Sequence, residues 1–316
     1  MTSAAPDVDF QAQLAPFRPE LLAHCYRMTG SVHEAEDLVQ ETLLNAWRAQ
    51  ASFEGRSTLR TWLYRIATNT CLNALDSHRR RPMPTDLGPS ADASRPPVEV
   101  DGVLWVEPIP DAATEACSRE SVRLALIAAL QYLPPRQRAV LILRDVMQWR
   151  AAEVADVLGM TTAAVNSSLQ RARAQLDAAS PDRDTMMAEP VDAKQRDLLD
   201  RFVRAFENHD IEAIVTLFAE DAVMEMPPFT SWYRGAREIA RLVATWCPAT
   251  RAGDLRLVPI AANGQPGFAT YMRDPADGVY RKFKLEVLTL GADRVTHAVS
   301  FFDLSLFEAF GLPAQL

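Results

Sequence analysis

The hydrophobic residues of this chain form three periodic regions, and two polar stretches separate them. In the first region, up to about His78, apolar residues recur every three or four positions, as they do along one face of a helix. The second region, from Val122 to Leu176, repeats this spacing. Between them, Pro82 to Asp111 is rich in Pro, Asp and Ser, a composition typical of linkers. The pattern predicts two helical domains joined by a linker.

The third region begins after a second polar stretch, Ala179 to Asp192, and has a different character. Helical spacing continues through Lys194–Asn208 and Ile211–Phe218. Short segments rich in Val, Phe, Tyr and Thr then follow at 222–226, 255–259, 267–272, 280–290 and 294–304. Apolar and polar residues alternate from Lys282 to Val287, which is typical of a strand, and Asn263-Gly264 predicts a turn. We expect an antiparallel sheet preceded by helices, and hence an α+β domain.

A helix-turn-helix pattern occupies Ala151 to Arg173. Ala155 lies where two helices must approach closely, Gly159 where the turn needs a permissive backbone, and Val165 where the second helix meets the first. The second helix of such a motif usually enters the major groove of DNA. This part of the chain therefore predicts a DNA-binding domain.

The charge of the chain is distributed unevenly. Its 316 residues carry a formal net charge of −8, which is unusual for a DNA-binding protein. Local charge sets phosphate affinity, however, and Arg48 to Arg81 is strongly basic whereas Pro82 to Glu120 is strongly acidic. This local excess of acid lies in the linker and not in the predicted DNA-binding helices, so it does not argue against DNA binding.

Neither the cysteines nor the apolar runs suggest a metal site, a disulfide or a membrane span. The four cysteines are widely separated and have no metal-ligand spacing, so we expect free thiols and neither a metal nor a cofactor. No apolar run is long enough to span a bilayer, and no leader-like segment opens the chain. We therefore expect a cytoplasmic protein that does not contact a membrane.

Three stretches of the helical regions resemble a known family. Glu36 to Trp47 (EDLVQETLLNAW) and Phe53 to Arg81 resemble regions 2.2 to 2.4 of an extracytoplasmic-function (ECF) RNA polymerase sigma factor of the sigma-70 family. Leu133 to Leu176 resembles region 4 of the same family. The C-terminal third is similar to a SnoaL-like domain of the NTF2-like superfamily, through its opening helix pair, Glu220 to Gly235, and Val299 to Pro313.

These resemblances imply a multidomain chain with two all-α sigma domains followed by an α+β NTF2-like cone. We expect sigma region 2 at 10–85, an acidic Pro-rich linker at 86–112, sigma region 4 at 113–179, a second linker at 180–193 and the SnoaL-like domain at 194–316. The implied function is that of a sigma factor, not an enzyme. It would bind core RNA polymerase, recognise −35 and −10 promoter elements and initiate transcription, with the C-terminal domain regulating it in cis.

The resemblance implies that region 2 docks on a coiled coil of the polymerase clamp, and that a region 4 helix docks on the flap. The polar face offered to the clamp comprises Asp37, Gln40, Glu41 and Asn45, and such an acidic strip suits a basic partner. Trp47 is expected in the core. A solvated helix face is the alternative for the polar strip.

The helix that begins near Thr58 is expected to open the −10 element. Unstacked bases are held by aromatic faces, polar edges and a basic backbone track. The candidate residues are Phe53, Arg56, Trp62, Arg65, Asn69, Asn73, Arg79 and Arg80, and Arg81 would join the phosphate contacts. The alternatives are that Trp62 is simply buried and that the arginine run only improves solubility.

The second helix of the helix-turn-helix is expected to read the −35 element. Val165, Leu169, Ala172 and Leu176 should face inward. The outward and flanking candidates for base and phosphate contacts are Arg150, Thr162, Ala163, Asn166, Ser167, Gln170, Arg171 and Arg173. A helix-turn-helix repressor or activator that binds an operator without polymerase is the main alternative function.

The linker and the C-terminal domain hold further candidates. Trp105 and Pro108 are expected to anchor the third domain against the two sigma domains, because a Trp in a Pro-rich linker usually packs against another part of the protein. An unknown small ligand could occupy a pocket whose candidate residues are Met226, Trp232, Tyr271, Phe283 and Asp303. An enzyme built on the cone is a second alternative. Its inward polar candidates are Glu225, Tyr271, His297 and Asp303, and no acid–base pair is evident among them because sequence does not fix the strand register.

Overall fold

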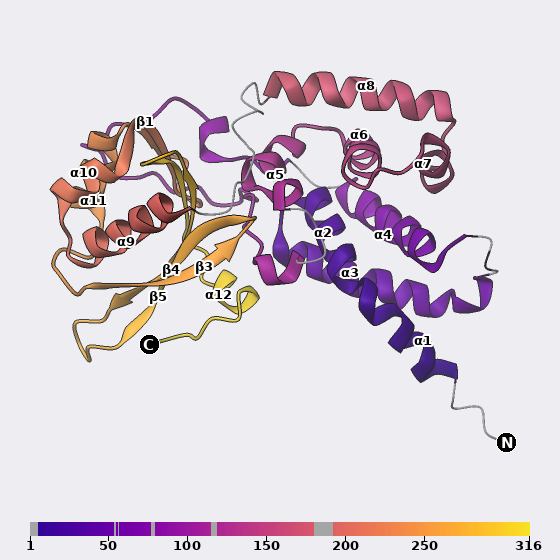
Figure 1. Ribbon diagram of the computed structural model, residues 1–316, viewed down its shortest axis with the longest axis horizontal. Helices are drawn as coiled ribbons and strands as arrows, with labels where there is room; N and C mark the ends of the chain where they lie inside the picture. The colour runs from indigo at the N-terminus through magenta and orange to yellow at the C-terminus, as the bar shows by residue number, and fades with distance from the viewer. Residues whose placement is uncertain (1–5, 54, 56, 77–79, 115–118, 180–191) are drawn as a thin grey trace. The chain divides into compact units, whose positions relative to one another are not determined.

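The computed structural model describes residues 6–53, 55, 57–76, 80–114, 119–179 and 192–316. The chain divides into two compact units, shown in Figure 1. Unit 1 comprises Met1–Arg81 with Asp111–Met186, and unit 2 comprises Pro82–Pro110 with Met187–Leu316. Most of the acidic Pro-rich linker predicted at 86–112 lies in unit 2, because residues 82–110 belong to the same unit as the C-terminal domain.

The first half of unit 1 contains α1 (Pro6–Leu14), α2 (Arg18–Thr29), α3 (Val32–Arg48) and α4 (Leu59–Leu75). Local chemistry sets their boundaries. Gly30 ends α2 in the left-handed conformation, at φ 74°, and Ser31 caps α3 by accepting a hydrogen bond from the Glu34 amide at 3.1 Å. Thr58 caps α4 in the same way, with the Thr61 amide at 3.1 Å. The start predicted near Thr58 for α4 is confirmed.

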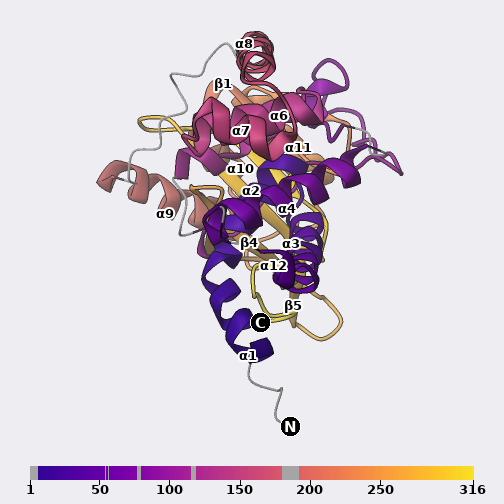
Figure 2. The same ribbon diagram turned by 90° about the vertical axis from the view of Figure 1, so that its right-hand side faces the viewer.

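The second half of unit 1 contains α5 (Leu124–Leu130), α6 (Pro135–Leu141), α7 (Ala151–Leu158) and α8 (Thr162–Ala179), and a π-helical turn at Ile142–Val146 continues α6. Figure 2 shows α8 nearly end on, beside α6 and α7. Gly159 ends α7 at φ 62°, as the turn of the helix-turn-helix requires. The expected inner face of α8 is buried: Val165, Leu169, Ala172 and Leu176.

Unit 2 contains the two predicted helices α9 (Ala193–Glu207) and α10 (Ile211–Leu217), together with α11 (Ala236–Trp246) and α12 (Leu306–Ala309). Its strands are β1 (Phe218–Glu225), β2 (Trp232–Arg234), β3 (Leu255–Ala262), β4 (Gln265–Arg273), β5 (Tyr280–Leu290) and β6 (Val295–Phe301). Helix α11 and strand β2 were not predicted from the sequence. The spacing of Ile239, Leu242, Val243 and Trp246 would have indicated α11.

The strands form one sheet in the order β2-β1-β6-β5-β4-β3. The expectation of a purely antiparallel sheet was wrong, because β1 and β6 run parallel, with Val223 opposite His297. The other neighbouring strands are antiparallel. A parallel pair needs a long connection, and here the whole of β2 to β5 supplies it. Sequence periodicity does not reveal which distant strands pair.

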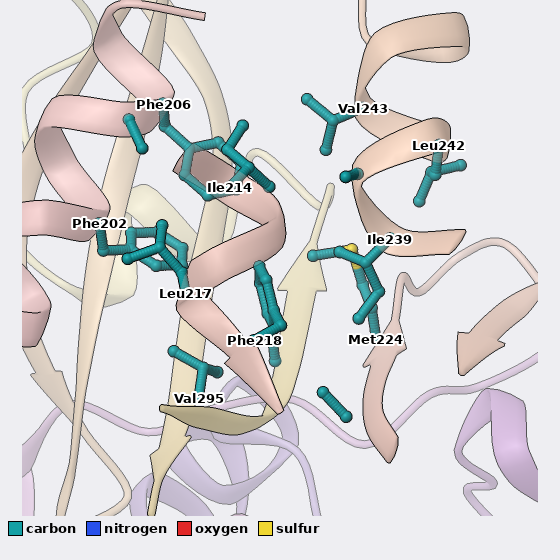
Figure 3. Packing of buried hydrophobic residues seen from close by; sticks show 14 of the residues in the cluster. Phe202, Phe206, Ile214, Leu217, Phe218, Met224, Ile239, Leu242, Val243 and Val295 are labelled. Carbon is teal, nitrogen blue, oxygen red and sulfur yellow. The ribbon is translucent and has the colours of Figure 1, made fainter. Parts of the chain in front are cut away.

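Helices α9, α10 and α11 pack on one face of this sheet and bury its main hydrophobic core (Figure 3). The Phe202 ring stacks on Phe206, with ring centres 4.4 Å apart, and on Phe268 of β4, at 5.5 Å. On the opposite face, Tyr271 contacts Phe307 of α12, with ring centres 5.3 Å apart. Alternate residues of β4 and β5 thus point either toward α9, α10 and α11 or toward α12. The pocket described below lies on the first of these faces. Among the described residues, no helix is both long and apolar enough to cross a membrane.

Candidate functional site

The polar face of α3 is exposed along its length. Asp37, Gln40 and Glu41 are exposed, whereas Asn45 is half-buried. Two large apolar residues continue this stripe, since Leu44 is 44% exposed and Trp47 is 37% exposed. The expectation that Trp47 belongs to the core was wrong.

The stripe could have been found from helical spacing, because positions three and four residues apart share one face. Gln40, Leu44 and Trp47 follow this spacing. We call the exposed set Asp37, Gln40, Glu41, Leu44 and Trp47 the α3 stripe. Apolar side chains ringed by acidic and polar groups are suited to a protein partner.

The predicted −10 residues of α4 lie on an accessible surface of this helix. Asn69 and Asn73 are exposed, and the half-buried Trp62 packs against Phe53, with ring centres 5.1 Å apart. The Arg65 side chain is 41% exposed and forms an ion pair with Asp156 of α7. Arg56 and Arg79 lie outside the described residues.

Further contacts join α4 to the second half of unit 1. The Tyr64 ring meets the Trp149 ring edge to face, with centres 5.4 Å apart, and its hydroxyl lies 3.9 Å from the Met147 sulfur. Together with the Arg65–Asp156 pair, these contacts place the start of the helix-turn-helix against α4. Part of the predicted promoter surface is therefore engaged within unit 1.

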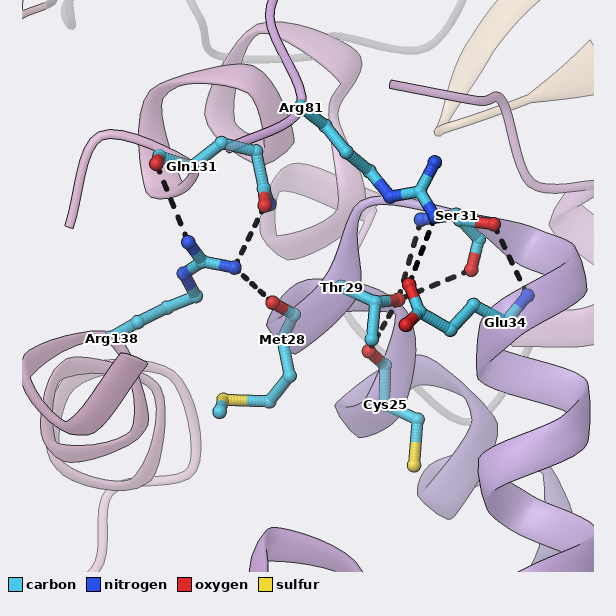
Figure 4. Close-up of polar contacts among 8 residues, drawn as sticks. All are labelled: Cys25, Met28, Thr29, Ser31, Glu34, Arg81, Gln131 and Arg138. Carbon is cyan, nitrogen blue, oxygen red and sulfur yellow. Dashed lines mark hydrogen bonds and ion pairs between the residues drawn. The ribbon is translucent and has the colours of Figure 1, made fainter. Parts of the chain in front are cut away.

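Arg138 forms a second link between the two halves of unit 1, shown in Figure 4. Its guanidinium donates to the carbonyl oxygen of Met28 in α2 and, at 2.7 Å, to Oε1 of Gln131. The residue is 4% exposed, and burial lowers its pKa to about 10. Arg138 lies in Leu133–Leu176, the stretch that resembles region 4, and the sequence assigned it no role.

The arginine run at the end of region 2 makes contacts inside unit 1. The Arg80 guanidinium lies over the Tyr132 ring, 3.5 Å from its centre, and Arg81 pairs with Glu34 at 3.0 Å. Arg81 is the more restrained of the two, because only 10% of its side chain is exposed. A phosphate contact by Arg81 would require this pair to break.

The predicted outer face of α8 is open to solvent. Six of the candidates are exposed: Thr162, Ala163, Asn166, Ser167, Gln170 and Arg171. Arg173 is also exposed but makes two hydrogen bonds to the Asp145 carboxylate, at 2.6 and 2.8 Å. Arg150 pairs with Glu153 in the cap of α7 at 3.0 Å. Gln170 and Arg171 are the longest exposed candidates for which no ion pair is seen in the described part of the chain, and Arg171 donates one hydrogen bond, to Ser168 Oγ at 3.3 Å.

The segment 82–110 is held by the C-terminal domain, and we call it the docked linker. Near β2, the Ala91 amide donates to the Trp232 carbonyl at 2.7 Å, and the Trp232 indole donates to the Gly88 carbonyl at 2.8 Å. The Val98 amide donates to Ser231 Oγ at 2.9 Å. These bonds incorporate the linker into the edge of the sheet.

The end of the docked linker meets the β3–β4 turn. The Ile109 amide donates to Asn263 Oδ1, and the Asn263 amide donates to the Ile109 carbonyl, both at 3.0 Å. Val106 and Ile109 are fully buried, Pro108 is buried and Trp105 is half-buried. The Trp105–Pro108 stretch singled out in the sequence is thus packed in the same unit as the C-terminal domain.

A carboxylate–imidazole pair lies beside the start of the docked linker. His297 Nε2 is 2.8 Å from Oε1 of Glu225, and Oε2 of Glu225 accepts from the Thr85 amide at 2.9 Å. Both side chains were inward candidates in the sequence, but their pairing was not predicted. The parallel register of β1 and β6, which sets Glu225 near His297, is not visible in the sequence.

The C-terminal domain contains a cavity of about 290 Å³ between the sheet and helices α9 and α11. Of the predicted pocket residues, Met226 and Phe283 line it. The others lie elsewhere: Trp232 holds the docked linker, the Tyr271 hydroxyl donates to the Pro313 carbonyl on the opposite face, and Asp303 is exposed. Strand alternation separates Tyr271 from the cavity, because its neighbour Thr270 takes the inward position.

Comparison with known proteins agrees with this architecture. Residues 14–81 match the family model for Sigma-70 region 2, residues 123–176 that for Sigma-70, region 4, and residues 199–302 that for a SnoaL-like domain. The ECF RNA polymerase sigma factor SigG of Mycobacterium tuberculosis is 56% identical over 316 residues, covering 98% of this chain and 85% of the relative. SigJ of the same species is 28% identical, covering 73% and 71%.

Among solved structures, the crystal structure of Mycobacterium tuberculosis SigJ covers 96% of this chain and 99% of that one, with a TM-score of 0.62 and 23% identity. That likeness concerns the fold. The family assignment excludes the operator-binding repressor and the enzyme that were considered as alternatives. The chain belongs to the ECF RNA polymerase sigma factors, the transcription initiation factors that bind RNA polymerase and promoter DNA, and it carries a C-terminal SnoaL-like domain.

Proposed function

We propose that the C-terminal domain regulates the sigma domains in cis, by holding the docked linker as part of its own fold. The single observation that carries this proposal is the bonding between linker and domain. At one end Ala91 and Val98 bond to the β2 region, and at the other Ile109 and Asn263 bond to each other. The linker connects regions 2 and 4. Holding it in the C-terminal domain therefore limits how far apart the two regions can move.

Region 2 is proposed to bind the polymerase clamp through the α3 stripe. Exposed acidic groups at Asp37 and Glu41 would guide association with a basic coiled coil, and the apolar Leu44 and Trp47 would form the buried centre of the interface. Region 4 would dock on the flap while α8 reads the −35 element, and α4 would hold the unstacked −10 bases.

The packing inside unit 1 is proposed to be an inactive arrangement. Arg65 of the −10 helix pairs with Asp156, and Tyr64 packs on Trp149. Binding to polymerase would have to separate these contacts before α4 could hold DNA. The Arg65–Asp156 pair is solvent-exposed and therefore weak, about 1 kcal/mol or less, so it can open readily.

Transcription in vitro with core polymerase tests the regulatory proposal. Three proteins are compared: the full chain, a chain ending at Ala179, and the full chain with the linker released by Ser231→Ala and Asn263→Gly. We expect truncation and release to change promoter activity in the same direction, since both free the linker. A gain would make the C-terminal domain an inhibitor, and a loss would make it an activator.

Two results would contradict the proposal. In one, neither change affects transcription. In the other, truncation changes transcription but release of the linker does not, so the domain acts by another route. Arg251→Ala, which alters an exposed side chain of the same domain, serves as the control for the full chain.

A further inference from the structure

The cavity of the C-terminal domain combines apolar walls with a small polar floor. Its volume is about 290 Å³, and apolar side chains including Phe206, Met226 and Leu242 line most of it. Three residues able to form strong hydrogen bonds also line it: Thr270 of β4, and Lys284 and Glu286 of β5. A largely apolar pocket with few, convergent polar groups is the usual form of a small-molecule site.

The two charged residues of the floor neutralise each other. Lys284 Nζ donates to Glu286 Oε1 at 2.9 Å and to Ser300 Oγ at 3.0 Å. The Ser300 hydroxyl donates to the same Glu286 oxygen at 2.8 Å. Lys284 is 8% exposed and Glu286 is fully buried. Because their opposite charges cancel within the pair, a ligand in the cavity has no net charge to balance.

Two polar atoms of the floor have no hydrogen-bond partner in the described part of the chain: Glu286 Oε2 and Thr270 Oγ1. Thr270 is 1% exposed and Glu286 is fully buried. Buried polar atoms are almost always hydrogen-bonded, so both atoms require a partner. They are diagonal neighbours on one face of the sheet, because Thr270 pairs with Lys284 and Phe268 pairs with Glu286.

The chemistry of these atoms selects the partner. A carboxylate oxygen only accepts hydrogen bonds, whereas the threonine hydroxyl can donate. A single hydroxyl group placed between them would donate to Glu286 and accept from Thr270. A carboxylate would be repelled by Glu286, and an ammonium would add unbalanced charge beside Lys284 in an apolar wall.

The docked linker forms part of the same cavity. Pro97 lines it, and so does Trp246, whose indole donates to the Ala93 carbonyl at 2.9 Å. A molecule in the cavity would therefore touch the linker directly and also a side chain that holds it.

We infer that this cavity binds a small, uncharged, mainly apolar molecule with one hydroxyl group, an alcohol or a phenol, and that binding tightens the docked linker. Binding of this molecule does not depend on the proposed function. Its effect on the docked linker rests on the proposed function. Failure of one part can therefore be distinguished from failure of the other.

Three probes that share one ring system test the binding: 2-naphthol, naphthalene and 2-naphthoate. Equilibrium dialysis against the full chain should give tighter binding of 2-naphthol than of naphthalene, by about tenfold for a hydroxyl satisfied on both sides, and little binding of 2-naphthoate. Thr270→Val should reduce this preference without harming the fold, because it removes one of the two bonds to the ligand hydroxyl while no described protein group bonds to the hydroxyl it deletes.

Two further variants locate the binding. Tyr271→Phe removes a hydroxyl from the neighbouring residue on the opposite face, where it bonds to Pro313, and should leave 2-naphthol binding unchanged. Cys247→Phe, which places a ring in the cavity wall, should abolish it. Equal affinity for 2-naphthol and naphthalene, an unchanged preference in Thr270→Val, or retained binding in Cys247→Phe would overturn the inferred site.

Hydrogen exchange tests the effect on the linker. Addition of 2-naphthol should slow exchange of the Ala93 and Val98 amides, which bond to Glu238 and Ser231. Unchanged exchange when the cavity is saturated would overturn the tightening of the linker. The transcription comparison with the truncated chain would still decide separately whether the domain regulates in cis.

Discussion

Asn263 and Ile109 bond to each other in both directions across 154 positions of sequence. The Asn263 side chain accepts from the Ile109 amide, and the Asn263 amide donates to the Ile109 carbonyl, each at 3.0 Å. Asn263 is fully buried and has φ 57°, a left-handed conformation that asparagine tolerates better than most residues. One residue therefore shapes the β3–β4 turn and holds the end of the docked linker.

Removing the Asn263 side chain should loosen this end of the linker. Asn263→Gly keeps the backbone conformation accessible but leaves the buried Ile109 amide without its acceptor, at a cost of about 1–3 kcal/mol. Asn263→Asp keeps an acceptor oxygen and is the matched control. Hydrogen exchange at Ile109 should become faster in Asn263→Gly and much less so in Asn263→Asp. Equal exchange in the two variants would show that the side-chain bond does not hold the linker.

The apolar part of the α3 stripe should contribute to polymerase binding. Leu44→Gln replaces an exposed leucine by a good helix former, so the free energy of unfolding should change by only about 0.5 kcal/mol. Affinity for core polymerase should fall by about tenfold or more, as expected where an interface centre is lost. Leu87→Gln, at a leucine of similar exposure in the docked linker, is the control. If both variants bind polymerase like the original chain, Leu44 lies outside the interface.

Breaking the Arg65–Asp156 pair should favour the open arrangement of unit 1. Asp156→Ala should cost less than about 1 kcal/mol of stability, because both side chains are exposed. It should raise the affinity of the free protein for a single-stranded −10 oligonucleotide, measured by fluorescence anisotropy. Glu153→Ala, in the same helix but paired with Arg150, controls for the charge change. An equal rise in both variants would point to net charge alone.

Two neighbouring residues of α8 should affect DNA binding in different ways. Arg171→Ala should weaken binding to all sequences and reduce the slope of log affinity against log salt by about 1, as for a phosphate contact. Gln170→Ala should relax discrimination at one position of the −35 element by about 1–3 kcal/mol. Gln175→Ala is the control in the same helix, since its amide donates to the Tyr132 carbonyl. Indistinguishable salt slopes and base preferences among the three would exclude these roles.

His24 should make the stability of unit 1 depend on pH. Burial, and secondarily the charge of Arg27, lowers its pKa from 6.5 to about 3. The Thr68 hydroxyl donates to the Tyr64 carbonyl, so His24 Nε2, 3.0 Å away, donates to Thr68. Burial keeps the imidazole neutral. As pH falls, the unfolded chain binds this proton first. The stabilisation is therefore complete above pH 6.5 and declines between 6.5 and about 3, by up to about 1.4 kcal/mol per pH unit.

The variant His24→Phe keeps a ring against Tyr64, which lies 5.1 Å away between ring centres, but cannot titrate. Urea unfolding from about pH 7.5 to about pH 5 should show a shallower loss of stability in the variant than in the original chain. A pH dependence unchanged by the substitution would assign the acid sensitivity to other groups.

Local patterns determined much of this protein. Helical spacing and capping residues such as Ser31 and Thr58 gave the sigma helices, and the position of Gly159 gave the turn of the helix-turn-helix. These features depend on neighbours within a few residues, so they can be read along the chain. The inward and outward faces of α8 followed from the same spacing, with Val165 buried and Gln170 exposed.

The tertiary structure decided what depends on distant pairing. The parallel register of β1 and β6 brings Glu225 to His297, and strand alternation turns Thr270 toward the cavity while Tyr271 faces away. A shift of register by one residue would reverse every such assignment, and sequence alone does not set it. The tertiary structure also showed that the whole of residues 82–110 belongs with the C-terminal domain. The sequence indicated only Trp105 and Pro108, because the other bonds of the linker are made mostly by its backbone groups, which every residue shares.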